Sequence, residues 1–182
     1  MESAAVIIGI DPGTTQSAWC ELYDGKPQES AIVPNAEMLD KLRGRIAGWL
    51  TATDLIAIEM VAAMGMPVGK EIFETVRWIG RFQEAWERRG GSVQLVYRRE
   101  VKLFHCESAR ANDATIRAAL LDRYGPGRAI AVGSKYSPGP CYGIKSDCWS
   151  ALAVALTAEN KPLPPALFRE QPQQQPLAAN PF

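Results

Sequence analysis

Three carboxylates of the chain stand at positions where charged side chains can meet. Asp11 and Glu59 each end a short apolar run, and Asp147 lies at the start of an apolar segment of helical periodicity. In an open α/β sheet the crevice lies beyond the carboxyl ends of the strands, where Asp11 and Glu59 would both emerge. Two carboxylates about 5 Å apart repel by roughly 3 kcal/mol at an effective dielectric near 20. Such a site needs a bound cation, a shared proton or wide separation, and hard oxygen ligands without a soft partner favour Mg²⁺ or Mn²⁺ over zinc.

The run that ends in Asp11 is the element around which we expect the first half of the chain to be organised. It is rich in branched aliphatic residues, as is typical of a strand buried on both faces. The turn signal Asp24-Gly25-Lys26 predicts a hairpin, and Asn35 is a candidate N-cap. The predicted elements are a strand over 4–10, two antiparallel strands over 16–23 and 27–33, a helix from Asn35 to Leu50, and a strand over 54–59 parallel to the first.

The second half of the chain predicts two more layers and a polar tail. The pattern indicates a loop over 60–69, a helix from Lys70 to Arg89 with apolar residues on more than one face, a strand over 92–97, a helix capped by Asn112 or Ser108 that runs to Tyr124, a loop over 130–144, and a helix from Lys145 to Ala158. Pro and Gln dominate beyond Lys161, so we expect a domain over 1–160 and a disordered tail over 161–182.

Composition bounds the class of protein. With 182 residues, 47% apolar and 22% charged, the chain has the make-up of one globular domain. No apolar run reaches the length of a membrane span and no signal peptide opens the chain, so we expect a cytoplasmic protein without a membrane partner. The four cysteines form no C-x-x-C pair, which favours reduced thiols over a zinc site. Nothing in the sequence indicates an organic cofactor.

Positive charge gathers in one part of an otherwise neutral chain. Between Arg98 and Lys145 there are nine basic and four acidic residues, a local excess of five positive charges. A solvated face and a polyanion-binding surface are both compatible with this excess. The residues that we expect to contact a nucleic-acid substrate are Arg98, Arg99, Lys102, Lys135 and Lys145.

Three segments together resemble the RuvC-type Holliday-junction resolvases. They are Ile8-Gly9-Ile10-Asp11-Pro12-Gly13, Ile56-Ala57-Ile58-Glu59 and Asp147-Cys148-Trp149-Ser150-Ala151-Leu152-Ala153, in the family's order, spacing and strand–strand–helix context. The resemblance spans about residues 4–158, and the loop over 65–69 resembles phage-encoded members more weakly. It implies an α/β, ribonuclease H-like fold with a five-stranded mixed sheet in the order 3-2-1-4-5, flanked by helices.

The resemblance also implies an activity. Such a protein would be a homodimer, paired here through the helix over 70–89, that cuts Holliday junctions or other branched DNA during recombination and repair. It would require Mg²⁺, for which Mn²⁺ can substitute. On the matching positions Asp11, Glu59 and Asp147 would be catalytic metal ligands. Lys102, in a segment that resembles the family's Arg-x-Val-Lys, would be a catalytic cation near the scissile phosphate.

The sequence departs from the family at two positions. Ser150 stands where the family has a fourth carboxylate, and Ala62 stands where it has an aromatic residue that inserts at the junction. Met64 and Met66 are candidates for the lost wedge. Asp113, at the start of the helix that ends at Tyr124, is a candidate replacement ligand; the alternative is that it only caps or charges the first helical turn.

Two other function classes remain open from the sequence. Asp11-Pro12-Gly13-Thr14-Thr15 also resembles the first phosphate loop of actin-like sugar kinases, but that architecture needs a second domain and a second glycine-rich loop. With Ser150 replacing a carboxylate, the protein would alternatively bind or scaffold branched DNA without cutting it. ATP hydrolysis tests the first alternative and cleavage of four-way junctions tests the second.

Overall fold

A five-stranded mixed sheet forms the centre of the molecule. The computed structural model describes residues 6–44, 54–62 and 68–162. The strand order is β3-β2-β1-β4-β5, in which β1 to β3 form an antiparallel meander and β4 and β5 run parallel to β1. The predicted fold class and strand order are confirmed. The strands are β1 (Ile7–Pro12), β2 (Gln16–Tyr23), β3 (Lys26–Pro34), β4 (Leu55–Met60) and β5 (Ser92–Tyr97).

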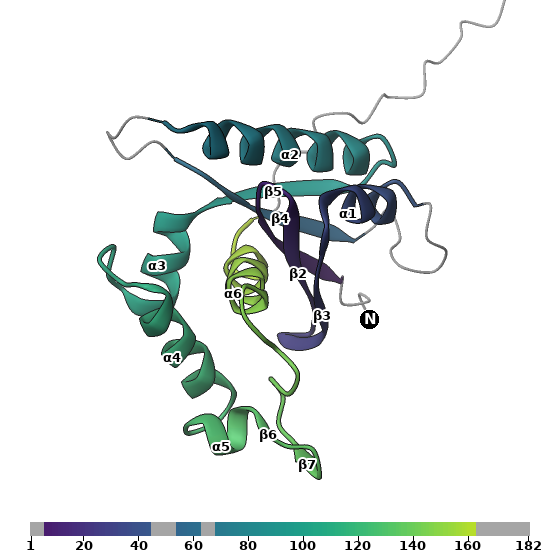
Figure 1. Cartoon of the computed structure of the whole chain (residues 1–182). Coiled ribbons are helices and arrows are strands. Elements are labelled where there is room, and N and C mark those ends of the chain that lie inside the picture. The colour runs from purple at the N-terminus through teal and green to yellow at the C-terminus, as the bar shows by residue number, and fades with distance from the viewer. Residues whose placement is uncertain (1–5, 45–53, 63–67, 163–182) are drawn as a thin grey trace, which may run out of the picture.

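Alternation along the buried strands divides the core into two layers. Ile8 and Ile10 of β1, with Ile56 and Ile58 of β4, face α1 (Asn35–Leu42) and α2 (Lys70–Glu87). The residues between them, beginning with Ile7, face α6 (Cys148–Glu159) on the opposite side. Figure 1 shows α1 and α2 on one side of the sheet and α6 on the other. Strands β1 and β4 are therefore covered on both faces, which explains their continuous apolar sequences.

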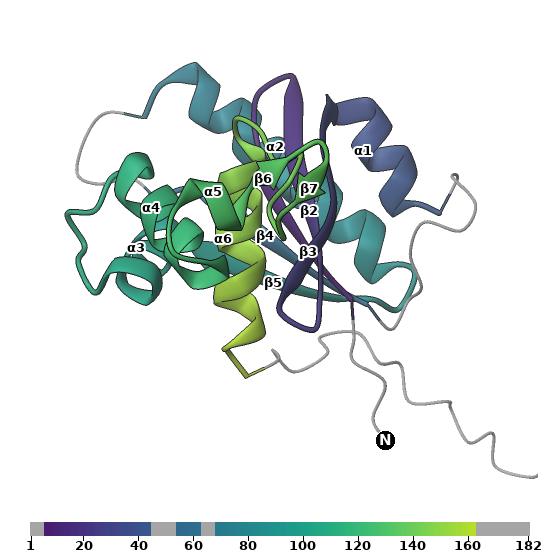
Figure 2. The ribbon, with the colours of Figure 1, turned by 90° about the horizontal axis from the view of Figure 1, so that it is seen from below.

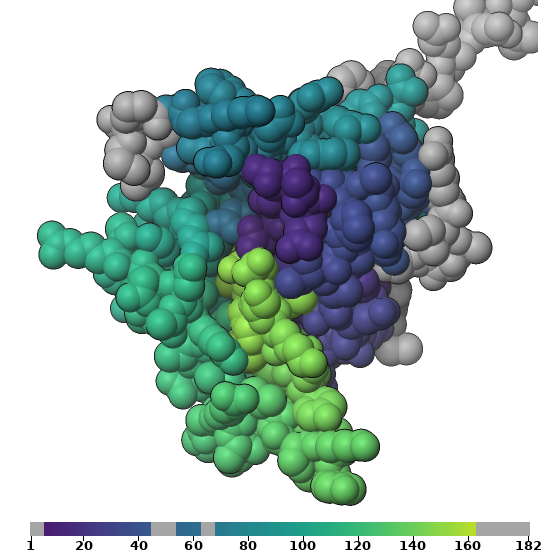
Figure 3. Space-filling view, in the orientation of Figure 1, coloured from purple at the N-terminus to yellow at the C-terminus, as the bar shows by residue number. Residues whose placement is uncertain are grey.

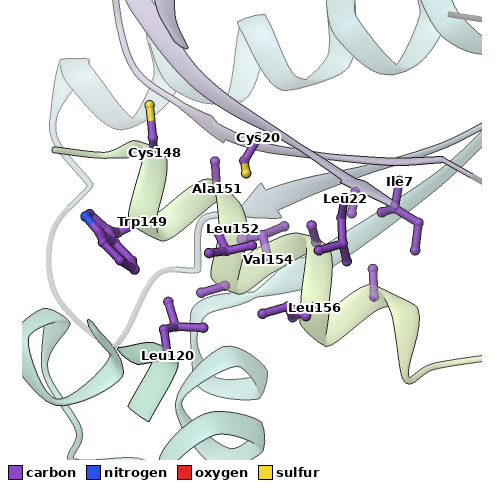
Figure 4. Packing of buried hydrophobic residues seen from close by; sticks show 14 of the residues in the cluster. Ile7, Cys20, Leu22, Leu120, Cys148, Trp149, Ala151, Leu152, Val154 and Leu156 are labelled. Carbon is purple, nitrogen blue, oxygen red and sulfur yellow. The ribbon is translucent and has the colours of Figure 1, made fainter. Parts of the chain in front are cut away.

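Helix α6 is apolar around its circumference because protein surrounds it. All of its residues from Cys148 to Ala158 except Ser150 are buried. Figure 4 shows how Leu152, Val154 and Leu156 pack toward the strands and toward Leu120. A helix that is hydrophobic on all sides is a central core helix, so the position of its first turn is fixed by packing.

The segment between β5 and α6 lies beyond α6 from the sheet. It contains α3 (Arg98–Cys106), α4 (Asp113–Tyr124), α5 (Arg128–Ala131) and a short hairpin of β6 (Gly133–Ser134) and β7 (Ser137–Pro138). Figure 2 shows these elements gathered around α6 on one side of the sheet. The loop expected over 130–144 thus contains the end of α5 and the hairpin. Helix α3 was not expected at all.

Several predicted boundaries are corrected by local contacts. Helix α1 ends at Leu42, before Gly44 with φ +72°, and the rest of the helix predicted to Leu50 lies outside the described residues. Asn35 is the first residue of α1 rather than its N-cap, which is Pro34. Asn112 caps α4 as expected, accepting a 2.9 Å hydrogen bond from the Thr115 amide. Helix α6 begins at Cys148, three residues later than predicted.

Other expectations fall partly or wholly outside the described residues. Most of the tail predicted over 161–182 and the two methionines proposed as a wedge, Met64 and Met66, belong to this group. Of the helices that the structure describes, none is long and apolar enough to cross a membrane.

Candidate active site

The alternation of side chains along the two paired strands places Asp11 and Glu59 on the same face of the sheet. Gly9 pairs with Ala57 and Ile10 with Ile58 in the parallel ladder between β1 and β4, so Asp11 and Glu59 come next in the same register. Because Ile10 and Ile58 face α1 and α2, the residues that follow them face α6. Glu59 is buried, with 7% of its surface exposed. The two carboxylates therefore emerge side by side at the carboxyl ends of adjacent parallel strands, as predicted.

A glycine brings the third carboxylate to this edge. A Cβ atom at Gly9 would lie 2.0 Å from the Ala151 carbonyl oxygen and 2.9 Å from the Ala155 Cβ atom, so α6 can approach β1 this closely only over glycine. Asp147 lies one turn before Ala151, whose amide donates a 3.0 Å hydrogen bond to the Asp147 carbonyl oxygen. The close packing of α6 on β1 thus holds Asp147 near the end of β1.

The electrostatics of Asp11 reflect this convergence. Burial, followed by the neighbouring carboxylates of Glu59 and Asp147, raises the pKa of Asp11 from 3.8 to about 7, against the opposing effect of the Arg98 guanidinium. Like charges that crowd a partly desolvated carboxyl group favour its neutral form. A perturbed carboxylic acid in a cleft is typical of a functional site.

Arg98 joins two of the acidic residues that the sequence singled out. Its Nη1 atom lies 3.1 Å from Oε1 of Glu59, and its Nη2 atom pairs with Oδ1 of Asp113. Asp113 is therefore neither the N-cap of α4, a role that Asn112 fills, nor isolated on the helix surface. Its carboxylate is linked through one guanidinium to Glu59, which brings the start of α4 to the same edge of the sheet.

The turn after Asp11 is held by Asn35 at the start of α1. This side chain is buried and donates a 2.9 Å hydrogen bond from Nδ2 to the Gly13 carbonyl oxygen. Its Oδ1 atom accepts a 2.6 Å hydrogen bond from the Ser17 hydroxyl. The backbone N–H of Asn35 donates to the Thr15 carbonyl oxygen at 3.0 Å. The sequence analysis interpreted Asn35 as a helix cap and missed this supporting role, because no neighbouring residue in the sequence indicates that its side chain faces the β1–β2 turn.

Two pockets flank the carboxylates and share Arg98. The pocket of about 450 Å³ between α3, α4 and α6 is lined by Asp113, Asp147, Ser150 and the exposed Arg117, whose guanidinium carbon lies 4.9 Å from the centroid of the Trp149 ring. The second pocket, of about 650 Å³, lies between β4, the start of α2, and α3. Figure 3 shows this side of the molecule, where the early residues of the chain (purple) and α6 (yellow-green) reach the surface beside the green α3 and α4.

The structure places the predicted basic residues at different distances from the carboxylates. Lys102 and Arg99 of α3 line the larger pocket together with Glu59. Lys145 is exposed two residues before Asp147, and Lys135 is exposed in the turn between β6 and β7. Only Arg98 has a direct contact with the acidic residues. Sequence reasoning missed this contact, although Arg98 follows β5 just as Glu59 ends β4, and parallel strands end at one edge.

Position 62 contributes no aromatic ring to this region. Ala62 lines the larger pocket, and the exposed aromatic side chain that lines the same pocket is Tyr97, at the end of β5. Tyr97 and Arg117 are among the pocket residues that the sequence interpretation did not single out. The position of Tyr97 at the end of a parallel strand was the available signal.

The three carboxylates offer hard oxygen donors but do not form a finished coordination sphere. Within the described part of the chain, no group of three or more His, Cys, Asp or Glu side chains is arranged so that it could hold a metal ion. The donor set nevertheless fits a hard divalent cation, since all three groups are carboxylates, and burial together with the neighbouring carboxylates of Glu59 and Asp147 raises the pKa of Asp11. A divalent cation held by these residues would offset the repulsion among them.

Comparison with known proteins identifies the architecture. No protein-family model and no curated protein sequence matches the chain. Among solved structures, that of Thermus thermophilus RuvC matches with 18% sequence identity and a TM-score of 0.58, covering 84% of this chain and 92% of that chain. T. thermophilus RuvC in complex with a Holliday junction substrate matches with the same identity and TM-score over 84% and 91% of the two chains. The protein therefore has a RuvC-type, ribonuclease H-like fold.

Proposed function

We propose that the protein is a metal-dependent, structure-selective endodeoxyribonuclease that hydrolyses phosphodiester bonds in Holliday junctions or other branched DNA. The observation that carries this proposal is the convergence of Asp11, Glu59 and Asp147 at one edge of the sheet, with the pKa of Asp11 raised to about 7. The RuvC-type fold adds support, because a protein of the same fold has been solved with a Holliday junction substrate. A role in DNA recombination and repair follows from such a substrate.

The chain's own residues divide the work of phosphodiester hydrolysis. Asp11, Glu59 and Asp147 would hold Mg²⁺ or Mn²⁺. When bound, the ion would activate water and stabilise the leaving oxygen. Arg98 fixes the position of Glu59 through a contact of 3.1 Å. Lys102, in the adjacent pocket, is placed to neutralise a phosphate next to the carboxylates. Asp113 and Ser150 line the pocket with Asp147, where their side chains could orient a water molecule by accepting a hydrogen bond from it.

A homodimer through α2 would present two such sites to a symmetric junction. Phe73 and Val76 lie one turn apart on the outer face of α2 and are 66% and 37% exposed. Gly80, one turn further, has no atom within 4 Å of the position of a Cβ atom, which leaves room for a second helix to approach. Two symmetric nicks require two active sites, so the exposed apolar face suits a second copy of the chain.

The test is cleavage of a synthetic four-way junction beside a linear duplex of the same sequence. We expect cleavage of the junction with Mg²⁺ or Mn²⁺, none in EDTA, and none by Asp11→Asn, which should still bind the junction. The exposed Asp122→Asn on α4 is the matched control and should cut like the wild type. Cleavage that persists in EDTA, or that survives Asp11→Asn, would refute the proposal.

One observation favours a second function, namely binding branched DNA without cutting it. Ser150 is neutral where the resembled family has a carboxylate, and no ready metal cluster exists among the described residues. A scaffold of this kind would bind junctions in preference to duplex but would leave them intact with any divalent metal. Ser150→Asp separates the two functions further, since a gain of cutting in this variant alone would favour the scaffold.

A further inference from the structure

The larger pocket beside the carboxylates has the location of a subsite for the cleaved strand. It lies beyond the carboxyl ends of β4 and β5 and is lined by residues of α3 and of the start of α2. Figure 1 shows that β5 leads directly into α3 and that α2 lies above them. Glu59 and Arg98 form part of the wall of the pocket, so it is continuous with the carboxylate site. Its volume of about 650 Å³ is in the range of small-ligand pockets, about 300–1,000 Å³. A nucleotide next to a phosphate bound at the carboxylates would lie at this pocket.

The walls of the pocket offer an aromatic ring and an apolar floor. Tyr97 is 44% exposed at the end of β5, the edge strand of the sheet. Its neighbour across the ladder is Met60, and Ile72 and Leu103 complete the apolar lining. An exposed aromatic side chain beside aliphatic ones is the surface on which an unstacked nucleobase packs, because every base has a flat π-face.

Charges in the pocket complement a nucleic-acid strand. Glu59 is paired with Arg98, and Glu100 is paired with Lys161 while it accepts a 2.7 Å hydrogen bond from the Tyr97 amide. In the part of the chain that the structure describes, no carboxylate pairs with Arg99 or Lys102. Both acids of the pocket are thus neutralised within the protein, and two cations remain for phosphates on either side of a base.

We propose that this pocket binds one unstacked nucleobase of the strand that carries the scissile phosphate, with the base stacked on Tyr97 and its flanking phosphates on Arg99 and Lys102. The proposal rests on the proposed function, since it places the base next to the bond to be cut. An aromatic platform surrounded by cations accepts any base, so the subsite selects unpaired, deformable DNA rather than a sequence. Branched DNA offers such bases at its crossover.

A thermodynamic cycle between protein and DNA tests the contact. Binding is measured with the Asp11→Asn protein, which we expect not to cut, on junctions in which single nucleotides around the crossover are made abasic. On the intact junction Tyr97→Ala should weaken binding by about 5- to 160-fold, the range found by alanine substitution for one base stacked on an aromatic ring. On the junction that lacks the stacked base, Tyr97→Ala should have no further effect.

Matched variants keep the result interpretable. Tyr97→Phe retains the ring and should bind like the parent protein. Tyr23→Ala removes a tyrosine of the same 44% exposure at the opposite end of the sheet and should also bind like the parent. A Tyr97→Ala effect that is absent, or equal on every abasic junction, would overturn the inference while the junction preference and cleavage of the wild type remain. A wild type that neither prefers nor cuts junctions would overturn the proposed function and, with it, this inference.

Discussion

The raised pKa of Asp11 predicts that ionisation of this carboxyl group lowers the unfolding free energy of the metal-free protein. Replacing the carboxyl group by a neutral amide should remove this loss. In the folded state the pKa of this group is about 7, against an ordinary value of 3.8. The folded state therefore holds a proton that the unfolded state has already released, so stability falls as the pH rises from about 3.8 to about 7. At 1.36 kcal/mol per pH unit, the full loss is about 4 kcal/mol.

The difference between wild type and Asp11→Asn isolates this group. In EDTA, the wild type should lose about 2.5 kcal/mol of unfolding free energy between pH 5 and pH 8 relative to Asp11→Asn, which has no proton to lose at this position. Urea denaturation followed by tryptophan fluorescence at several pH values measures both proteins. Asp122→Asn, which alters an exposed carboxylate of α4, should keep the wild-type pH dependence.

Divalent metal supplies a second arm of the same experiment. Saturating Mg²⁺ should flatten the wild-type curve above pH 5, because a bound cation favours the ionised carboxylate. The Asp11→Asn curve should respond less, since one ligand is gone. Wild-type and Asp11→Asn stabilities that remain parallel across this pH range would refute the view that Asp11 is crowded by Glu59 and Asp147.

Two further predictions concern packing and charge. Gly9→Ala should lower the unfolding free energy by about 1–3 kcal/mol, because the added methyl group would lie 2.0 Å from the Ala151 carbonyl oxygen. A loss below about 0.5 kcal/mol in urea denaturation would contradict the close approach of α6 to β1. Lys102→Ala should slow junction cleavage by about 100-fold while weakening binding much less. Single-turnover kinetics measure the cleavage rate, and titrations at several salt concentrations measure the affinity. Equal losses in both would mean that Lys102 only contacts the phosphate backbone of the DNA.

The sequence predicted the sheet because its signals are local and strong. The runs that end in Asp11 and Glu59 are continuous and apolar, and the helix between them favours a parallel return, so the pairing of these strands and the meeting of the two acids could be predicted from the residues. The full strand order was implied by the family resemblance. Helix α3 could not be found in the same way. Arg98-Arg99-Glu100-Val101-Lys102 contains one apolar residue, and the helix is stabilised by contacts that are distant in sequence, such as the hydrogen bond between His105 and the Ala153 carbonyl oxygen.

The supporting residues of the site were also invisible in the sequence because their partners come from elsewhere in the fold. Asn35 had the residue type of a helix cap, but the carbonyl groups that accept its hydrogen bonds belong to the β1–β2 turn. Asp113 had the position of a first-turn acid, and its actual partner is the arginine that follows β5. Residue type predicted that these side chains would be engaged, and only the tertiary structure assigns the groups that engage them.

Arg98 offsets part of the repulsion among the carboxylates at this edge of the sheet. A full charge pair separated by 3.1 Å, as between Arg98 and Glu59, attracts by roughly 5 kcal/mol at an effective dielectric of 20. Screening of this partly exposed guanidinium and the cost of its desolvation reduce that figure. The attraction is comparable to the roughly 3 kcal/mol of repulsion between two carboxylates about 5 Å apart, so one arginine suffices to hold Glu59 in place. It does not suffice for Asp11, whose pKa remains near 7 despite the arginine. Burial and the neighbouring carboxylates thus disfavour the ionised form of Asp11, so this is the residue at which a divalent cation would contribute most.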